Sequence, residues 1–379
     1  MKILIAGGGT GGHVFPGIAV AEELRRARPE CQVVFAGTRR GLESQAVPEA
    51  GFTIRYLMGS GFNRRRWWTW PVAGIVNLIG FLQAIVLVLM ENPGVVLGTG
   101  GYVSAPISFA AKLLGRPLIL QEQNSRPGLA NRMLARIADE VHLSFLEARS
   151  HFARKDHLKV TGNPVRSHIL AGDSDAAMRE FGLDPARPVV FVFGGSLGAT
   201  RINEATIETL RALQGRIALQ VILQTGRADF DRVKAVVDAE KLPAVVLPFV
   251  KNIHMAYAAA DLVVCRAGAM TLAEIAVCGL PAILVPYPYA AHNHQEDNAT
   301  NLVDRGAAVL ILDSELTGER LAREVAHLLA DKQALSRMSA NARLFARPDA
   351  ASRLALTLVR WAEGKGHAAP EESAAGGGR

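Results

Sequence analysis

The chain has 379 residues, of which 49% are hydrophobic and 20% are charged, and its formal net charge is +7. This composition excludes an intrinsically disordered chain, and the length is sufficient for two domains with separate cores. The three cysteines are too few and too scattered for a disulfide framework or a C-x-x-C metal site. The chain begins with an apolar strand and no secretory signal, so we expect it to work in a reducing cytosol.

Short apolar runs alternate with helical patterns along the chain, which is typical of parallel α/β architecture. The first half predicts strands at 2–6, 32–37, 53–57, 94–98, 117–121 and 140–144. The pattern starts again in the second half, with strands in 188–196, 218–226, 244–249, 261–268 and 282–288. Each half begins with a strand, a glycine loop and a helix, so we expect two doubly wound, Rossmann-like sheets.

The stretch GNPVR at 162–166 lies between the two halves and is the expected linker. We therefore expect an N-terminal domain at 1–163 and a C-terminal domain at 164–345, with a helix at about 346–365 that packs back on the first domain. Residues 366–379 are small, polar and glycine-rich, which predicts a disordered tail.

The positive charge is concentrated in the first half. Residues 1–163 hold 19 Lys and Arg against 11 Asp and Glu, a net +8, whereas the remainder of the chain is at −1. A basic half next to a neutral half indicates that one domain meets an anionic surface or ligand. The basic residues are not interleaved with stacking aromatics, so we expect no nucleic acid as a partner.

Segment 64–90 has three interpretations. It carries no charge for 24 residues after Arg66, which is long enough for a helix that spans a bilayer. It also stands where a parallel sheet needs a crossover helix, which predicts a buried core helix. Arg64–Arg66 and the nearby tryptophans Trp67, Trp68 and Trp70 instead favour an interfacial patch on a folded domain.

The glycine loop GGGTGGH at 7–13 follows the first strand and precedes a helical pattern. Its glycines satisfy the G-x-G-x-x-G spacing of a dinucleotide-binding turn. The second strand, however, ends in Arg39 and Arg40 instead of the acidic residue that would hold a ribose, so only NADP would fit. His13 adds a group that a cofactor loop does not require. At a helix N-terminus its charged form is disfavoured, so it is a candidate general base.

The second half repeats this arrangement of strand, glycine loop and helix with GGSLGA at 194–199, in which Ser196 supplies a hydroxyl. Farther along, Gly268 ends a strand and Glu274 follows in the first turns of a helix. A helix N-terminus directed at a diphosphate, with a carboxylate one turn later for the ribose hydroxyls, is typical of a nucleotide-sugar site. Gln295 lies in a polar loop after the next strand, where it could face the sugar of the donor.

The chain carries seven motifs in a fixed order: GGGTGGH, GGYVSAP (100–106), LQEQN (120–124), GNPVR, GGSLGA, CRAGAMTLAE (265–274) and HQ-x-x-NA. In this order and spacing they resemble the MurG family of glycosyltransferases, from residue 1 to about 365. The family moves N-acetylglucosamine from UDP-GlcNAc to undecaprenyl-pyrophosphoryl-muramyl-pentapeptide, which converts lipid I to lipid II in peptidoglycan synthesis.

The resemblance implies a GT-B fold, in which two Rossmann-like domains face each other across a cleft. The nucleotide would bind mainly to the C-terminal domain and the lipid acceptor to the N-terminal domain. The basic first half and segment 64–90 would then dock to an anionic membrane surface. This implies a peripheral protein at the cytoplasmic face of the inner membrane.

The resemblance also implies roles for single residues. Thr10, Gly11 and Gly12 would border the donor sugar and phosphates, Asn124 and Gln295 would contact the sugar, and Val250 would meet uracil through its backbone. Arg166 and Ser196 would contact UDP. The nucleotide would further be held by Ala269, Met270, Thr271, Leu272, Ala273 and Glu274. Small substitutions at Ala105, Ala267, Ala273 and Val250 depart from the family pattern and affect the expected affinity only.

Two D-x-D triplets, at 173–175 and 229–231, match the signature of metal-dependent sugar transferases. Neither adjoins a nucleotide motif, so we interpret both as helix caps or chance matches. A helix dipole and Arg166 could balance the charge of the leaving UDP, so we expect no metal and no cofactor.

The sequence thus predicts an inverting hexosaminyltransferase. The 4-hydroxyl of the acceptor would attack the anomeric carbon of the donor, with His13 as the base, and give a β-linkage. The alternatives are a related transferase with a soluble acceptor, an NADP-dependent oxidoreductase, and a non-catalytic membrane scaffold.

Overall fold

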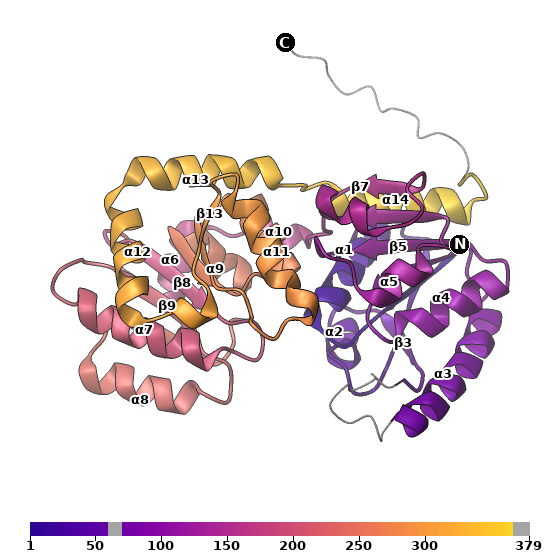
Figure 1. Ribbon diagram of the computed structural model, residues 1–379, viewed down its shortest axis with the longest axis horizontal. Helices are drawn as coiled ribbons and strands as arrows, with labels where there is room; N and C mark the ends of the chain where they lie inside the picture. The colour runs from indigo at the N-terminus through magenta and orange to yellow at the C-terminus, as the bar shows by residue number, and fades with distance from the viewer. Residues whose placement is uncertain (60–69, 367–379) are drawn as a thin grey trace, which may run out of the picture.

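The computed structural model describes residues 1–59 and 70–366, which form two parallel α/β units that lie side by side (Figure 1). In this part of the chain the first unit holds a seven-stranded sheet with the order β3-β2-β1-β4-β5-β6-β7. The second holds a six-stranded sheet with the order β10-β9-β8-β11-β12-β13. The strand order reverses beside β1 and beside β8, so both sheets are doubly wound, and the predicted fold class is confirmed.

The elements of the first unit alternate between strand and helix. They are β1 (Lys2–Gly7), α1 (Gly11–Ala27), β2 (Gln32–Gly37), α2 (Glu43–Glu49), β3 (Thr53–Tyr56), α3 (Trp70–Glu91), β4 (Val95–Gly100), α4 (Ser104–Leu113), β5 (Leu118–Glu122), α5 (Leu129–Leu134), β6 (Glu140–Leu143), η2 (Leu146–His151) and β7 (Leu158–Val160).

The second unit repeats the alternation. Its elements are η3 (Ser167–Leu170), α6 (Ser174–Phe181), β8 (Val189–Phe193), α7 (Thr200–Leu213), β9 (Gln220–Gln224), α8 (Phe230–Glu240), β10 (Ala244–Leu247), α9 (Ile253–Ala259), β11 (Leu262–Cys265), α10 (Ala269–Cys278), β12 (Ala282–Leu284), η4 (Ala291–Asn293), α11 (His294–Val303), β13 (Ala308–Leu310), η5 (Asp313–Glu315), α12 (Gly318–Ala330) and α13 (Lys332–Phe345). One further helix, α14 (Ala350–Ala362), follows α13.

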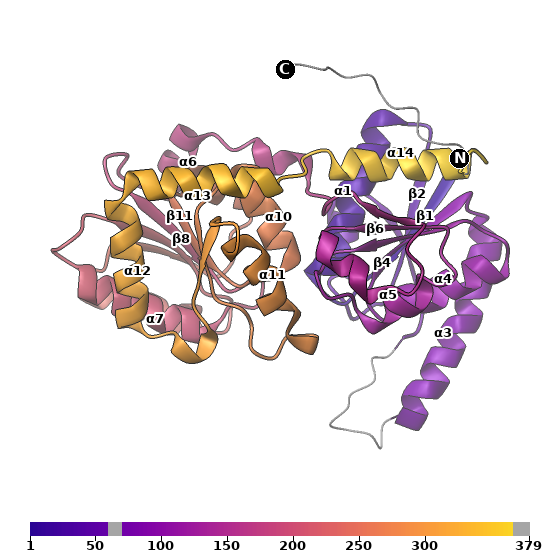
Figure 2. The same ribbon diagram turned by 45° about the horizontal axis from the view of Figure 1, so that its top comes forward.

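The helix α14 ends the described chain on the first unit, not on the second. It contacts α1, β1 and β4, and Leu354, Leu358 and Trp361 join the apolar core formed with Ile3 and Ile5. Figures 1 and 2 show α13 running along the second unit and α14 continuing over the first. The chain therefore passes between the units twice, before η3 and again after α13. The tail predicted to be disordered lies, from residue 367 on, outside the described residues.

The buried carboxylate of Glu140 binds α14 to the sheet of the first unit. Glu140 in β6 accepts hydrogen bonds from Arg360 Nη2 at 2.7 Å and from Trp361 Nε1 at 2.9 Å. Lys159 Nζ lies 2.8 Å from its other oxygen, and His142 Nε2 lies 3.4 Å away. Burial alone would raise the pKa of Glu140, but the hydrogen bonds from His142, Lys159 and Trp361 outweigh it and lower the pKa to about 2.

We expect Glu140→Gln to lower the free energy of unfolding at neutral pH. A pKa of about 2 instead of 4.5 corresponds to about 3 kcal/mol. Lys159 is 39% exposed, and solvent screening reduces the expected loss to about 1–2 kcal/mol. Because the folded-state pKa is lowered, this stabilisation is present above pH 4.5 and is lost as the pH falls toward 2.

Urea unfolding of wild type and variant at neutral and at acidic pH measures this effect. The difference between the two proteins should shrink in acid, and an equal difference at both pH values would contradict the ionic explanation. Glu363→Gln is the control, because Glu363 pairs with Lys365 at the surface and its loss should change little.

The helix α3 presents most of its apolar residues to solvent. Val72, Ile75, Leu78, Leu82, Val86 and Leu89 are between 54% and 64% exposed. Only 22% of its most apolar window is buried, on a narrow face that contains Ala84 and Val88 and packs on α4. Figure 2 shows the start of α3 extending away from both units. The interpretation of segment 64–90 as a plain core helix is therefore wrong.

By length and composition, α3 could also cross a membrane. It nevertheless serves as the crossover between β3 and β4, and Met58 N donates to Gln83 Oε1 at 2.7 Å. Arg64–Arg66, Trp67 and Trp68, which carry the interfacial interpretation, lie outside the described residues.

Candidate active site between the two units

The glycine loop after β1 is held by a buried carboxylate that the sequence analysis missed. Glu43, at the start of α2, is fully buried and accepts a hydrogen bond from Gly9 N at 2.8 Å. Its other oxygen accepts from Thr38 N at 2.9 Å and from Thr38 Oγ1 at 2.8 Å. A Cβ atom on Gly8 or Gly41 would come within 2.5 Å of this carboxylate, which explains the glycines there. The signal in the sequence is a lone glutamate in the turn after the second strand.

His13 is the third residue of α1 and is half-buried. Its ring lies against the end of β4, where a Cβ on Gly100 would come within 2.7 Å of the imidazole Cδ2. Thr10 Oγ1 is 3.4 Å from Nδ1. Burial lowers the pKa of His13, His294 lowers it further, and the hydrogen bond with the Gly8 backbone opposes them. The imidazole is therefore neutral near pH 7, and desolvation is the main cause.

Thr10 and the two glycines after it surround the N-terminus of α1. Thr10 is the exposed N-cap residue in an extended conformation, and its carbonyl accepts from His13 N at 3.1 Å. Gly12 has open space where a Cβ would stand, with Thr10 Oγ1 as its nearest neighbour at 3.8 Å. A Cβ on Gly11 would instead press on the Phe15 ring at 2.9 Å.

In the second unit, Gln224 connects two predicted ligand segments and was also missed. It ends β9 and is buried, and its Nε2 donates to Gly195 O at 3.0 Å. Its Oε1 accepts from Val250 N at 2.8 Å, so a uracil bound to the Val250 backbone would use the carbonyl oxygen. Ser196 is exposed at the tip of the same glycine loop. Gly198 is required there, because it has φ +79° and a Cβ would lie 1.9 Å from Thr225 O.

The helix α10 begins just after the carboxyl end of β11, a central strand of the second sheet, and its first backbone amides have no partner within the helix. Gly268 is its N-cap, and the first intrahelical bond runs from Leu272 N to Gly268 O. The amides of Ala269, Met270 and Thr271 therefore have no acceptor within the helix and form a ready site for an anion. The side chains of Met270 and Leu272 are buried, so these two residues could offer a ligand only their backbone.

Glu274 lies one turn farther along α10, and it is buried instead of exposed on a helix surface. Tyr257 Oη donates to its Oε2 at 3.0 Å, and Arg166 Nη2 lies 3.6 Å from its Oε1. Burial raises the pKa of Glu274, while Arg166 and the Tyr257 hydrogen bond oppose the rise. The Arg166 guanidinium also stacks on the Phe15 ring of α1, 4.5 Å from its centroid, so it joins the two units beside the site.

The two residues expected to contact the sugar come from different units. Asn124 follows β5, and Gln295 is in the first turn of α11. Gln295 Oε1 accepts from Tyr287 N at 3.0 Å, which leaves its amide hydrogens to donate elsewhere. Asn124 Oδ1 accepts from Asn298 Nδ2 at 3.2 Å, so this loop and this helix meet directly.

The two D-x-D triplets are not arranged as a metal site. Asp173 caps α6 by accepting from Ala176 N at 2.7 Å, which confirms its interpretation as a helix cap. Asp229 pairs with Arg232 at 2.7 Å and accepts from Asn203 Nδ2 at the same distance. Within the described ranges, no group of three His, Cys, Asp or Glu side chains could hold a metal ion.

Two family models match the chain, one in each half. Residues 3–143 match the glycosyltransferase family 28 N-terminal domain, and residues 189–354 match the glycosyltransferase family 28 C-terminal domain. Among solved structures, MurG of Acinetobacter baumannii superposes with a TM-score of 0.75 at 30% identity, over 95% of this chain and 99% of that one. A glycotransferase of kitacinnamycin has a TM-score of 0.71 at 19% identity, which indicates a shared fold only.

Curated relatives carry the same full name, UDP-N-acetylglucosamine–N-acetylmuramyl-(pentapeptide) pyrophosphoryl-undecaprenol N-acetylglucosamine transferase. The protein of Desulforamulus reducens is 39% identical over 93% of this chain and 96% of its own length. The protein of Chlorobaculum parvum is 44% identical over 95% of this chain and 99% of its own length. At this identity over nearly the full length, the chain belongs to glycosyltransferase family 28, among the MurG-type N-acetylglucosaminyltransferases with a GT-B fold.

Proposed function

We propose that this chain transfers N-acetylglucosamine from UDP-GlcNAc to undecaprenyl-pyrophosphoryl-muramyl-pentapeptide, which makes lipid II from lipid I. The observation that carries the proposal is identity of 39% and 44% with transferases of this name over at least 93% of the chain. The site supports it chemically, because open helix amides, a buried carboxylate–arginine pair and a neutral histidine stand at the junction of the two units.

The C-terminal unit, 164–345, is the proposed donor domain. The first amides of α10 and the exposed Ser196 loop would hold the diphosphate, and Glu274 would accept hydrogen bonds from the ribose. Arg166 would balance the negative charge that develops as UDP leaves. Asn124 and Gln295 would hold the sugar from opposite sides of the junction.

The N-terminal unit, 1–163 with α14 packed on it, is the proposed acceptor domain. His13 would take the proton from the acceptor 4-hydroxyl as the oxygen attacks the anomeric carbon. The bond from that carbon to the UDP oxygen breaks on the opposite face, so the configuration inverts and the product is β-linked. UDP leaves with the electron pair.

Transfer of radiolabelled GlcNAc from UDP-GlcNAc to lipid-linked muramyl-pentapeptide by the purified protein tests this function. Label in the lipid fraction is the expected result. Label transferred only to a soluble acceptor would favour the related transferase with a soluble acceptor. Protection from proteolysis by NADP but not by UDP would favour an oxidoreductase.

We also propose that α3 docks this enzyme to the cytoplasmic face of the inner membrane as a peripheral protein. The exposed apolar face of α3 and the net charge of +8 in residues 1–163 support docking to an anionic surface. Because α3 also serves as a crossover of the first sheet, we favour attachment along one face over a spanning helix.

We expect high salt to release much of the protein from anionic lipid vesicles. Each basic residue near such a surface contributes ~1 kcal/mol that salt screens. Leu82→Glu, in the middle of the exposed face of α3, should also reduce the fraction of protein that sediments with the vesicles. Leu356→Glu is the matched control, because Leu356 is 62% exposed on α14, away from α3. Extraction by detergent alone, with no effect of salt, would contradict peripheral docking.

A further inference from the structure

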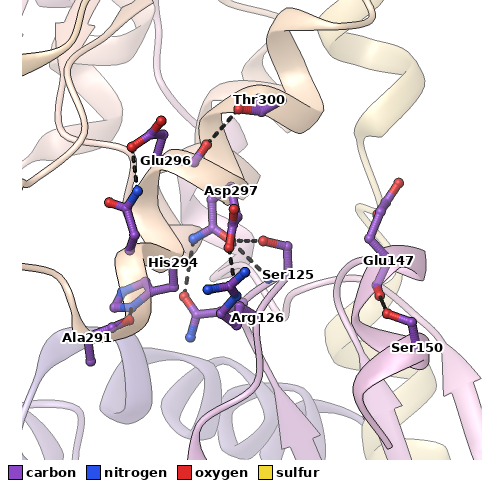
Figure 3. Close-up of polar contacts among 12 residues, drawn as sticks. Ser125, Arg126, Glu147, Ser150, Ala291, His294, Glu296, Asp297 and Thr300 are labelled. Carbon is purple, nitrogen blue, oxygen red and sulfur yellow. Dashed lines mark hydrogen bonds and ion pairs between the residues drawn. The ribbon is translucent and has the colours of Figure 1, made fainter.

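The helix α11 of the second unit contacts a loop of the first unit through one buried residue, Asn298. Asn298 is fully buried, and its Oδ1 accepts from Ser125 N and from Ser125 Oγ, both at 2.9 Å. Figure 3 shows Ser125 directed at this helix. Ser125 is itself only 4% exposed, so water does not compete for these two hydrogen bonds.

The amide nitrogen of Asn298 holds two further groups. It donates to Asn124 Oδ1 at 3.2 Å and to Ala267 O at 3.4 Å. An asparagine amide offers two donor hydrogens and two acceptor lone pairs, and all four are used. Ala267 is in the turn before α10, so Asn298 connects three parts: the loop after β5, α11, and the entry to the nucleotide helix.

Asn124 is fixed from its own unit as well. Glu122, buried in β5, accepts from Asn124 N at 3.0 Å and from Asn124 Nδ2 at 3.3 Å. The same carboxylate accepts from Asn131 Nδ2 at 2.8 Å, which makes the loop rigid within the first unit. After its contacts with Glu122 and Asn298, the half-buried Asn124 amide keeps one donor hydrogen and one acceptor lone pair. These remain available to a ligand.

Gln295 lies one turn before Asn298 on the same helix. Residues three apart on a helix share a side, so the two amides lie on the same side of α11. The positions of Asn124 and Gln295 relative to each other therefore depend on the hydrogen bonds of Asn298.

Within the described ranges, two ion pairs also cross between the units near α11, and the side chains of both are exposed. Arg126 pairs with Asp297 at 3.0 Å, and Arg305 pairs with Glu147 at 3.2 Å. Their side chains are between 39% and 49% exposed, and exposed ion pairs contribute little. Figure 3 shows the Arg126–Asp297 pair beside Ser125, with Glu147 farther away. Among these three contacts of α11, the one between Asn298 and Ser125 is the buried one, and we expect it to contribute most to the position of the loop.

We propose that Asn298 is a positioning residue that locks the loop at Asn124 against the donor domain, and so couples closure of the two units to binding of the donor sugar. The inference rests on the proposed function and deepens it. The two side chains proposed to hold the sugar, Asn124 and Gln295, come from different units, whereas the side chains proposed to hold the nucleotide, Arg166, Ser196 and Glu274, all lie in the second. Loss of the lock should therefore weaken binding of UDP-GlcNAc and leave binding of UDP nearly unchanged.

Calorimetric titration of the full chain with UDP-GlcNAc and with UDP tests this. Asn298→Ala removes four hydrogen bonds and leaves Ser125 buried without its partner, so we expect the Kd for UDP-GlcNAc to rise by about 10–100-fold. The Kd for UDP should stay within about twofold. Ser125→Ala loses only the hydroxyl bond and should raise the Kd for UDP-GlcNAc by about 2–10-fold. Arg305→Ala, which breaks the exposed ion pair with Glu147, should change neither Kd.

Equal weakening of UDP and UDP-GlcNAc would overturn the inference, because Asn298 would then only maintain the fold of the second unit. Unchanged binding of both ligands would overturn it as well. If Asn298→Ala does not fold, Ser125→Ala carries the same comparison. A wild-type protein that does not bind UDP-GlcNAc would overturn the proposed function and this inference together, whereas normal wild-type binding with equal weakening overturns the inference alone.

Discussion

His13→Ala and His13→Gln should lower kcat for transfer by about 10²–10⁴-fold, the usual size of general-base catalysis. The base must be neutral to accept the proton of the acceptor hydroxyl. Burial lowers the pKa of His13, so the neutral form dominates at pH 7 and is lost only in acid. The rate of the wild-type enzyme should therefore fall as the pH decreases through this lowered pKa, and the variants should show a flatter acidic limb.

The same variants should bind UDP normally, because the nucleotide groups belong to the second unit. His151→Ala is the control, since this histidine is exposed at the end of η2 and should leave kcat and its pH profile unchanged. A His13 variant with near-normal kcat and the wild-type acidic limb would contradict the role of base. His13 would then only help to position the acceptor at the N-terminus of α1.

The periodicity of the sequence predicted eleven of the thirteen strands in the described part of the chain. The predicted strand at 32–37 has the observed bounds, and most others agree within one or two residues. The strands β7 and β13 were missed, because each has only three residues and lies at a sheet edge. Such short strands exist through pairing with a neighbour, which a local pattern does not contain.

Segment 64–90 shows a different limit of prediction from sequence periodicity. An apolar run without charges is equally compatible with a core, a membrane surface and a bilayer interior, because periodicity does not report what lies opposite the helix. The exposure of Ile75, Leu78 and Leu82 excludes the core interpretation, and that fact exists only in three dimensions.

The residues of the candidate site also fall into those that the local sequence marks and those that only the three-dimensional structure reveals. Residues in glycine loops and at helix starts were predicted, because local chemistry marks them: His13, Ser196 and the first turn of α10. Glu43 and Gln224 were missed, and Asn298 was included in the HQ-x-x-NA motif without a role, because each acts through a hydrogen bond to a distant segment. Their partners lie 34, 26 and 173 residues away along the chain. Gln224 interrupts an apolar stretch and Glu43 is a lone glutamate in the turn after the second strand, but neither signal by itself identifies a partner.

The second large effect is expected at Glu274. Glu274→Ala should raise the KM for UDP-GlcNAc far more than it lowers kcat, because a ribose contact is made alike in the ground and transition states. Loss of a hydrogen bond to a charged group costs ~1.5–3 kcal/mol, which is about 10–150-fold in KM. The buried hydrogen bond between Tyr257 and Glu274 allows a second variant to separate a role in ribose binding from a role in packing.

Tyr257→Phe removes the hydroxyl that donates to Glu274 at 3.0 Å but leaves the carboxylate and its pairing with Arg166 in place. If the carboxylate binds ribose, Tyr257→Phe should change KM much less than Glu274→Ala, although both variants lose a buried contact. If Glu274 instead only maintains the packing between α9 and α10, both variants should lose thermal stability together and the KM of each should stay near that of the wild type. Steady-state kinetics and melting temperatures of the two variants separate these results, and an unchanged KM in Glu274→Ala would refute the ribose assignment.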